Sequence, residues 1–173
     1  TNYDGNYSFN ATAFDNAGNV NYSETRRITI DTTYPLIDYG TGTLNSYSNV
    51  SQSNIYVNVT ITEINEANIT FRLYNSTAQV NVTTLGAGNR TILWTSLPNA
   101  VYTYNVTSVD LASNSNTTAT RTITLDNQNP NATLNTPTNN TYGNASSQNF
   151  TANISDNLGI KNATLNIYNL TGL

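Results

Sequence analysis

Asparagine is the residue type through which this sequence offers the most chemistry. The chain of 173 residues holds 32 Asn, 30 Thr and 14 Ser, and 18 of the Asn stand in the pattern Asn-X-Ser/Thr with X other than proline. That pattern is the acceptor signal for N-linked glycans, and random placement of these residues would give roughly 8 such sites. We expect glycans on Asn6, Asn10, Asn21, Asn49, Asn58, Asn68, Asn75, Asn81, Asn89, Asn105, Asn116, Asn131, Asn139, Asn144, Asn149, Asn153, Asn162 and Asn169.

A β-strand with one polar face can produce the pattern Asn-X-Ser/Thr without carrying any glycan. Polar residues recur at every second position of such a strand, so Asn-X-Thr follows from the alternation alone. Six pairs of sites nevertheless fall at matching places, about 95 residues apart: Asn10 with Asn105, Asn21 with Asn116, Asn49 with Asn144, Asn58 with Asn153, Asn68 with Asn162, and Asn75 with Asn169. We favour glycosylation and keep the alternation as the competing interpretation.

Carboxylates are the main remaining candidates for catalysis or metal binding, because the chain contains no His and no Cys. Their absence removes Ser-His-Asp and Cys-His catalysis and the usual zinc sites. Asp15, Asp31, Asp110 and Asp126 could ligate Ca²⁺, which takes six to eight oxygen ligands, but the sequence has no DxDxDG motif. We interpret them as residues that cap turns or end strands, and we expect no metal and no cofactor.

Two further arrangements are weaker signals. Glu63 and Glu66 could be a glycosidase pair, but no supporting pocket residues stand near them, so we expect both in a solvated loop. Lys161 could form an isopeptide bond, yet the corresponding residue of the complete repeat is Ala67. We predict no catalytic residue and no enzymatic activity.

The charge balance excludes other classes of partner. The net charge is −4 with only 6 Lys and Arg, which are scattered, so no basic surface follows a phosphate backbone and we expect no nucleic acid. No apolar run reaches 18 residues, so this chain has no predicted membrane segment. A surface of amides and hydroxyls in place of Lys and Glu points to an extracellular, cell-surface location.

The elements that position these residues occur in repeated form. GNYSFNATAFDNAGNVNYSETRRITIDTTY, residues 5–34, aligns without a gap with AVYTYNVTSVDLASNSNTTATRTITLDNQN, residues 100–129. A spacing of about 95 residues matches one small β-domain. We predict C-terminal strands of a partial Ig-like domain in 1–32, a complete Ig-like domain in 33–127, and N-terminal strands of another partial domain in 128–173.

Alternation of apolar and polar residues defines the predicted strands and their buried faces. We expect these residues to face inward: Tyr7, Phe9, Ile55, Val57, Val59, Ile61, Ile69, Phe71, Leu73, Tyr102, Tyr104, Val106, Ile123 and Leu125, with Phe150, Ala152, Ile154, Ala163, Leu165 and Ile167 in the last unit. Trp94, the single Trp, is expected in the core. The stretch from Thr32 to Pro35 predicts a short, stiff junction between units.

The combination of YSFNATAFDNAGN, a closing RITID or TITLD strand, and a proline four residues after its Asp resembles the tandem Ig-like repeats of bacterial and archaeal surface adhesins, S-layer-associated proteins and extracellular filaments. The second copy departs from the pattern with Ser113 in place of the turn glycine. The Asn-rich, Lys-poor composition is more similar to archaeal members. The resemblance implies an all-β chain of tandem immunoglobulin-like or fibronectin-III-like sandwiches with stalk, adhesion or filament functions.

We therefore predict a structural component of an extracellular, heavily N-glycosylated filament, stalk or cell-surface layer. The alternative is an adhesin or carbohydrate-binding module that presents loops to a ligand. The expected partners are N-linked glycans and copies of the chain arranged head to tail, by strand complementation between 128–173 and 1–32, or neighbouring repeats in a longer chain. Between head-to-tail copies and neighbouring repeats, we favour neighbouring repeats, with this chain as a segment cut from a longer polypeptide.

Overall fold

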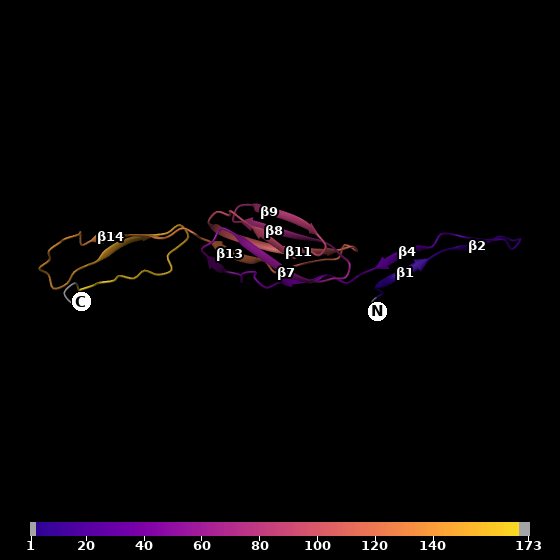
Figure 1. Cartoon of the computed structure of the whole chain (residues 1–173), viewed down its shortest axis with the longest axis horizontal. Coiled ribbons are helices and arrows are strands. Elements are labelled where there is room, and N and C mark those ends of the chain that lie inside the picture. Colours follow the sequence, from indigo (N-terminus) through magenta and orange to yellow (C-terminus); the bar gives the residue numbers. More distant parts are fainter. Residues whose placement is uncertain (1–2, 170–173) are drawn as a thin grey trace.

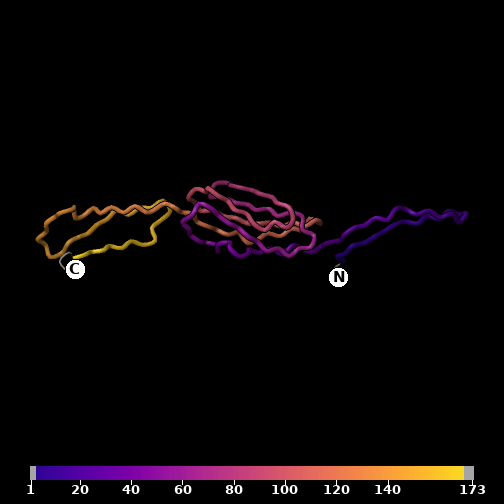
Figure 2. Tube along the Cα trace, viewed as in Figure 1, coloured from indigo at the N-terminus to yellow at the C-terminus, as the bar shows by residue number. Residues whose placement is uncertain are grey.

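The computed structural model describes residues 3–169, and within that range the chain is all-β. Three groups of strands follow one another along a single long axis (Figure 1). We call them the N-terminal hairpin (residues 5–30), the central sandwich (36–125) and the C-terminal segment (131–169). The hairpin leaves one end of the sandwich and the C-terminal segment leaves the other (Figure 2). In residues 3–169 no helix has the length and apolar character needed to cross a membrane.

The central sandwich consists of two sheets, whose strands pair in antiparallel fashion except for β6 and β13. Its strands are β5 (Leu36–Tyr39), β6 (Ser48–Val50), β7 (Ile55–Thr62), β8 (Glu66–Asn75), β9 (Gln79–Gly86), β10 (Thr91–Trp94), β11 (Ala100–Asp110), β12 (Ser115–Thr117) and β13 (Arg121–Leu125). One sheet has the order β10-β7-β5, and the other has the order β6-β13-β11-β8-β9, with β12 paired to β11. Strands β9 and β10 therefore lie at sheet edges.

The core fills the space between these sheets, as the alternation predicted. Its buried apolar residues are Ile55, Val57, Val59, Ile69, Phe71, Leu73, Trp94, Tyr102, Tyr104, Val106, Ile123 and Leu125, and Ile37 and Ile61 pack against them. Side chains from strands far apart in sequence meet here because β-branched and aromatic residues occupy one face of each strand. Trp94 is confirmed as a core residue, and its ring centroid lies 6.1 Å from that of Tyr104.

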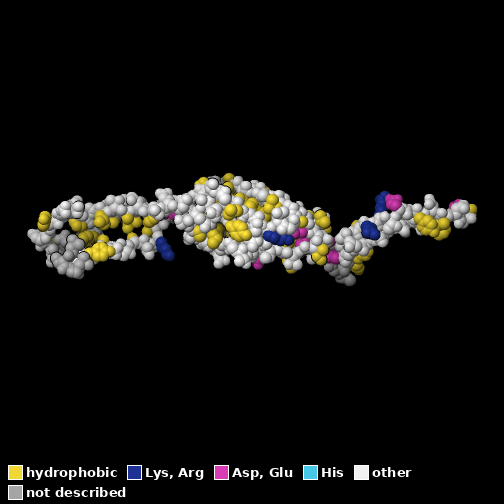
Figure 3. Space-filling view, viewed as in Figure 1, with side chains coloured by type: hydrophobic (Ala, Val, Ile, Leu, Met, Phe, Trp, Pro, Cys, Tyr) yellow, Lys and Arg dark blue, Asp and Glu magenta, His cyan; other side chains and the backbone are white. Residues whose placement is uncertain are grey.

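Two details of the sandwich were not expected. Strand β6, in which the sequence analysis names no inward-facing residue, pairs in parallel with β13 through Ser48 opposite Ile123. Thr70 lies between the predicted inward residues Ile69 and Phe71, so the alternation places it on the opposite face. It is nevertheless buried because β9 pairs alongside β8, and its hydroxyl is hydrogen-bonded to that of Thr84 at 2.9 Å. The outward face remains largely uncharged, and Figure 3 shows few Lys, Arg, Asp or Glu side chains on this side of the sandwich.

The N-terminal hairpin contains β1 (Gly5–Phe9), β2 (Thr12–Phe14), β3 (Val20–Tyr22) and β4 (Arg26–Ile30). β1 pairs with β4, and β2 pairs with β3. The prediction that Tyr7 and Phe9 are buried is wrong for this chain, because both side chains are exposed. They do share one face, but no second sheet covers that face in the described residues.

The C-terminal segment contains β14 (Asn131–Thr136) and β15 (Thr151–Ser155), which pair in antiparallel fashion. Residues 161–169, predicted to form the next strand, run alongside without strand assignment. The predicted inward residues Phe150, Ile154, Leu165 and Ile167 are exposed. A β-strand is defined by its hydrogen bonds to neighbouring strands. Residues 161–169 have no strand assignment because no described strand pairs with them.

Candidate glycan acceptors and inter-unit junction

The predicted glycan acceptors are distributed over all three groups of strands. Those with exposed side chains are Asn6, Asn10, Asn21, Asn49, Asn89, Asn116, Asn131, Asn139, Asn144, Asn149, Asn153, Asn162 and Asn169. Those that are half-buried are Asn58, Asn68, Asn75, Asn81 and Asn105. No acceptor in this set is fully buried, so exposure alone does not separate them. The hydrogen bonds of each side-chain amide are more informative, because a glycan is attached to the amide nitrogen.

At Asn75 and Asn81 the protein donates hydrogen bonds to the side-chain amide oxygen, so the amide nitrogen points away from these contacts. Asn75 Oδ1 accepts hydrogen bonds from the backbone N–H groups of Thr77 (3.0 Å) and Ala78 (2.8 Å), which form the turn after β8. Asn81 Oδ1 accepts from Trp94 Nε1 (3.0 Å) and Thr83 Oγ1 (2.8 Å). Both arrangements fix the side chain, and the same contacts can persist when the nitrogen carries a sugar.

At Asn58 and Asn116 the protein holds the nitrogen itself. Asn58 Nδ2 donates to the backbone oxygen of Thr41 at 3.0 Å, and a Cβ at Gly40 would approach that nitrogen to 2.9 Å. Asn116 Nδ2 donates to the backbone oxygen of Pro35 at 3.0 Å. A sugar on either nitrogen would occupy space next to main chain. The structure therefore divides sites that the sequence pattern treats alike.

The junction between the hairpin and the sandwich is organised around Asp31. Its carboxylate accepts a hydrogen bond from Asn65 Nδ2 at 2.7 Å, and its backbone oxygen accepts one from Asn114 Nδ2 at 3.0 Å. Asn65 and Asn114 belong to different loops at the end of the sandwich, and the backbone N–H of Leu111 donates to the backbone oxygen of Asn65 at 2.8 Å. Two loops of the sandwich are thus tied to Asp31, directly after the hairpin.

The chain that crosses the junction is also fixed from the hairpin side. Asp4 accepts hydrogen bonds from the backbone N–H of Thr32 (2.9 Å) and from Thr33 Oγ1 (2.7 Å). Pro35 is fully buried, and Asn116 donates to its oxygen. Thr32, Thr33 and Tyr34 are exposed, so it is these hydrogen bonds and the buried Pro35 that restrict the connection. The predicted short, stiff junction agrees with these contacts.

Three carboxylates meet at the same end of the sandwich. Ligand oxygens of Asp31, Glu63 and Asp110 all lie within 4.8 Å of one another. Hard cations prefer such oxygen groups, but three carboxylates are fewer than the six to eight ligands that Ca²⁺ takes. Asp110 is buried and already accepts hydrogen bonds from the backbone N–H and the side-chain amide of Asn114, each at 2.8 Å. Glu63 was missed as a member of this cluster by sequence reasoning.

The other two carboxylates weighed for calcium lie elsewhere and cap turns. Asp15 accepts from Asn19 Nδ2 at 2.7 Å and from the backbone N–H groups of Asn19 and Ala17. Hydrogen bonds from the side chain and backbone of Asn19 lower the pKa of Asp15 below its ordinary value, as expected for an acceptor of several N–H groups. Asp126 accepts from Asn99 Nδ2 at 3.1 Å and from the backbone N–H of Gln128 at 3.2 Å.

Glu66 does not lie in a solvated loop, and that prediction is wrong. It is the first residue of β8, its side chain is 7% exposed, and Arg90 binds it with two parallel hydrogen bonds of 2.8 and 2.7 Å. A bidentate pair of this kind has fixed geometry. Glu63 instead accepts a hydrogen bond from the backbone N–H of Asn65 at 2.7 Å. The two glutamates therefore serve separate structural roles. Lys161 is exposed.

A polar network surrounds the hydroxyl of Tyr39, the last residue of β5. Tyr39 Oη donates to the backbone oxygen of Ala119 at 2.8 Å and accepts from Thr118 Oγ1 at 2.9 Å, and Thr118 Oγ1 accepts from the backbone N–H of Val106 at 3.0 Å. The guanidinium of Arg121 lies 4.1 Å from the centroid of the Tyr39 ring. Burial raises the pKa of Tyr39 above its ordinary value, and it raises the pKa of Tyr104 to about 12.

Comparisons with known proteins find one family model and solved structures of low identity that are similar to parts of this chain. The family model described as "Bacterial Ig-like domain" matches residues 1–32. A search of curated proteins finds no match. Among solved structures, an engineered protein at 1.98 Å resolution is 16% identical with a TM-score of 0.42, covering 53% of this chain and 20% of its own. Dimeric latent PorU from Porphyromonas gingivalis is 12% identical with a TM-score of 0.41, covering 72% of this chain and 12% of its own. The chain thus spans a fifth or less of those proteins.

Taken with the family match, the all-β architecture fits an Ig-like surface protein. Ig-like folds suggest a surface or structural role and are typically not enzymes, although a fold by itself does not assign function.

Proposed function

We propose that the chain is a structural part of an extracellular, N-glycosylated stalk, filament or surface layer, in which Ig-like units follow one another end to end at a period of about 95 residues. The proposed units are 1–32, 33–127 and 128–173. The role is mechanical and not catalytic. The partners are neighbouring units and N-linked glycans.

One observation carries the proposal: the hairpin of 5–30 repeats that of 100–125 residue for residue. Tyr7 pairs with Ile28 and Phe9 with Arg26, while Tyr102 pairs with Ile123 and Tyr104 with Arg121, each 95 positions later. The short pairs follow the same rule, with Phe14 opposite Val20 and Val109 opposite Ser115. Equal register over two pairs of strands supports one domain type used repeatedly.

The junctions support an array with a preferred direction. Asn99, at the place of Asp4, accepts a hydrogen bond from the backbone N–H of Asn127 at 3.2 Å, just as Asp4 accepts one from that of Thr32. Asp126, at the place of Asp31, accepts one from the backbone N–H of Gln128, as Asp31 does from that of Thr33. The same contacts therefore recur where each unit ends, which favours a rod over flexibly linked beads.

The glycan part of the proposal is tested on native material by mass spectrometry of its peptides. We expect peptides from this chain to carry sugar masses, on exposed sites such as Asn49 and on Asn75 and Asn81. Asn58 and Asn116 serve as internal controls and are expected to be unmodified. Peptides that contain Asn49, Asn75 and Asn81 and carry no sugar would refute glycosylation and leave the sequons as a product of strand alternation.

The structural part is tested by electron cryo-microscopy of the same material. Rods or continuous polymers with density extending beyond Asn Nδ2 are expected. Isolated particles with bare asparagines would contradict the proposal and favour an adhesin or carbohydrate-binding module instead.

A further inference from the structure

The longest free sheet edge of the central sandwich is strand β9. It has eight residues, Gln79–Gly86, whereas the other strands at sheet edges, β5, β6 and β10, have three or four. An edge strand leaves a row of backbone N–H and C=O groups without a strand partner, and proteins commonly protect such an edge with Lys, Pro, a short strand or a bulge. β9 contains no charged residue and no proline, and its residues 81–86 pair with β8 without a register shift.

The composition of β9 makes its edge suited to pairing with another strand. Val80 and Val82 are 41% and 44% exposed, and the segment VNVTTL is uncharged and rich in β-branched residues. Segments of this kind readily add to an open sheet edge. The guanidinium of Arg72, opposite Val82, gives no protection, because it donates to Thr107 Oγ1 at 2.8 Å in β11, on the other side of β8.

Asn81 brings a glycan acceptor to this edge. It stands in the pattern Asn81-Val82-Thr83, and its Oδ1 accepts the hydrogen bond from Trp94 Nε1. Trp94 is the last residue of β10, which is an edge strand of the opposite sheet, so Asn81 lies where the edges of the two sheets meet. Among the described residues no group accepts from Asn81 Nδ2, and that nitrogen is not sealed from solvent. A sugar on it leaves the sandwich beside the free edge of β9.

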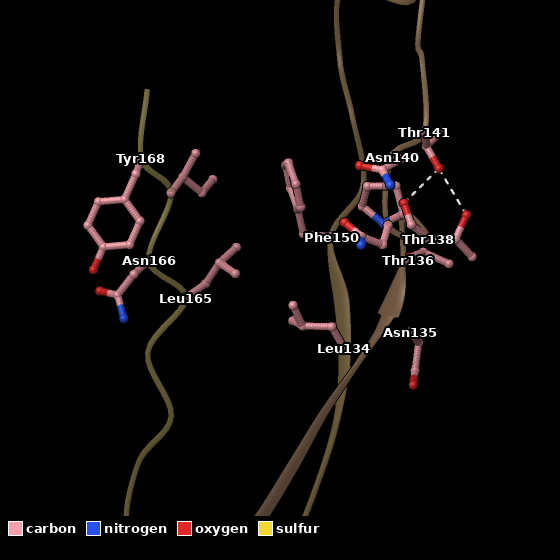
Figure 4. Close-up of a pocket in the computed structure, with 13 residues that line it drawn as sticks. Leu134, Asn135, Thr136, Thr138, Asn140, Thr141, Phe150, Leu165, Asn166 and Tyr168 are labelled. Atoms are coloured by element: carbon pink, nitrogen blue, oxygen red, sulfur yellow. Dashed lines mark hydrogen bonds between the residues drawn. The ribbon is translucent and has the colours of Figure 1, made fainter. Parts of the chain in front are cut away.

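Other acceptors are arranged differently. Asn89, just before β10, donates from Nδ2 to the backbone oxygen of the last residue of β9 at 2.9 Å, so a sugar there would start against the main chain. At Asn139, in the C-terminal segment, the acceptor pattern ends at Thr141, whose hydroxyl donates to the backbone oxygen of Thr138 at 2.7 Å (Figure 4). At Asn81 the hydroxyl of the pattern is instead used to hold the asparagine itself.

Asn75 shares that arrangement but not that place. Thr77 Oγ1 donates to Asn75 Oδ1 at 2.9 Å, as Thr83 Oγ1 donates to Asn81 Oδ1 at 2.8 Å. Asn75 is the last residue of β8, at the turn that leads into β9. The two sites therefore form a matched pair, of which one lies along the free edge and the other beyond its end.

We infer that an N-linked glycan on Asn81 covers the free edge of β9 and keeps the central sandwiches of separate molecules from pairing edge to edge. The inference rests on the proposed function, because it takes Asn81 as a glycosylated site. A strand added to β9 would run about 4.8 Å from it, through the space into which the sugar projects. The glycan takes the place of the lysine or proline that protects other sheet edges, in a chain with only 9% charged residues.

Removing the acceptor signal while keeping Asn81 tests the inference in protein produced with its native glycans. Thr83→Val abolishes the signal and retains the bond from Trp94. Thr77→Val is the matched control, because it removes the glycan of Asn75 and the equivalent threonine hydroxyl. Light scattering as a function of concentration should show Thr83→Val associating at concentrations roughly tenfold or more below those of the parent and of Thr77→Val. Hydrogen exchange of backbone amides in residues 79–86 should slow as it associates.

A second variant separates edge pairing from misfolding. Val82→Glu, added to Thr83→Val, places a charge on the exposed edge opposite Arg72 and should return association to the level of the parent, which it would not do for a misfolded chain. Equal association of Thr83→Val and Thr77→Val, association without slowed exchange in 79–86, or no rescue by Val82→Glu would each overturn the inference. These failures leave the glycan proposal standing when the Asn81 peptide of the parent carries sugar. A bare Asn81 peptide would overturn the inference at its premise.

Discussion

Replacing Tyr39 with Phe isolates one hydroxyl group in the polar network beside β5. The ring is retained, and with it the edge-on contact with Tyr104, whose centroid lies 5.7 Å away, and the position of Arg121 over the ring. What is lost is the hydrogen bond donated to Ala119, with its longer branch of 3.3 Å to the backbone oxygen of Tyr104, and the one accepted from Thr118. The carbonyl of Ala119 can turn to water, but Thr118 is buried, and its hydroxyl loses its acceptor.

The expected cost follows from these two bonds. Each hydrogen bond contributes about 1 kcal/mol, and a buried group left without a partner adds to that loss, so Tyr39→Phe should lower the free energy of unfolding by about 2 kcal/mol. Trp94 provides the assay, because it is the single Trp and lies in the central core. Its fluorescence during urea unfolding therefore reports on the central sandwich and not on the two flanking groups.

The matched control is Tyr47→Phe, since Tyr47 is 80% exposed, and its effect should stay within about 0.5 kcal/mol. A double-mutant cycle with Thr118→Val measures the coupling directly, and a coupling near zero would show that the two hydroxyls act independently. The reasoning is refuted if Tyr39→Phe changes stability no more than Tyr47→Phe does, with the same dependence on urea.

Three further outcomes are expected from the same assay. The pKa of Tyr104 is raised to about 12 and that of Tyr39 is also raised, so these hydroxyls ionise at lower pH in the unfolded chain than in the folded one. Stability should therefore be constant up to pH 10 and fall as pH rises toward 12. A flat profile across that window would contradict this expectation. Glu63→Gln keeps the acceptor for the N–H of Asn65 but removes one of three close carboxylates. In low salt with a chelator this variant should raise the free energy of unfolding by about 1 kcal/mol, and by less at high salt. A loss of stability, or a Ca²⁺-induced rise in the unfolding midpoint of the parent that the variant lacks, would argue against simple repulsion. Ser113 has φ = 72° where the hairpin has Gly18 at 86°, so Ser113→Gly should stabilise by about 0.5 to 1 kcal/mol, and an unchanged midpoint would show that the strain is already relieved.

The sequence predicted the strands of the sandwich well because each carries a strong period-two signal. Ile55, Val57 and Val59 alternate with polar residues, and all three are buried. The same signal misled at Tyr7 and Phe9: alternation states which side chains share a face, but only a second layer decides whether that face is covered. Strand β6 was missed because its parallel partner β13 is distant in sequence, and its own three residues carry no pattern.

The junction was less accessible to sequence reasoning. The pattern placed Asp31 at the end of a unit, but its partners Asn65 and Asn114 come from two other loops, and no local signal links them. Glu63 and Glu66 look alike in sequence, yet one joins the carboxylate cluster and the other is held by Arg90. Side-chain amides and carboxylates form these contacts through tertiary structure, which a one-dimensional period does not encode.

The uncharged outer face of the sandwich has a consequence for the conditions this protein tolerates. Only 9% of its residues are charged, and several of those charges are committed to internal partners, such as Arg90 to Glu66 and Arg121 to the ring of Tyr39. Little remains on the exterior for dissolved ions to screen or for mild acid to titrate. Amides and hydroxyls carry no net charge for salt to screen, so the solubility of the chain should change little across dilute to moderate ionic strength.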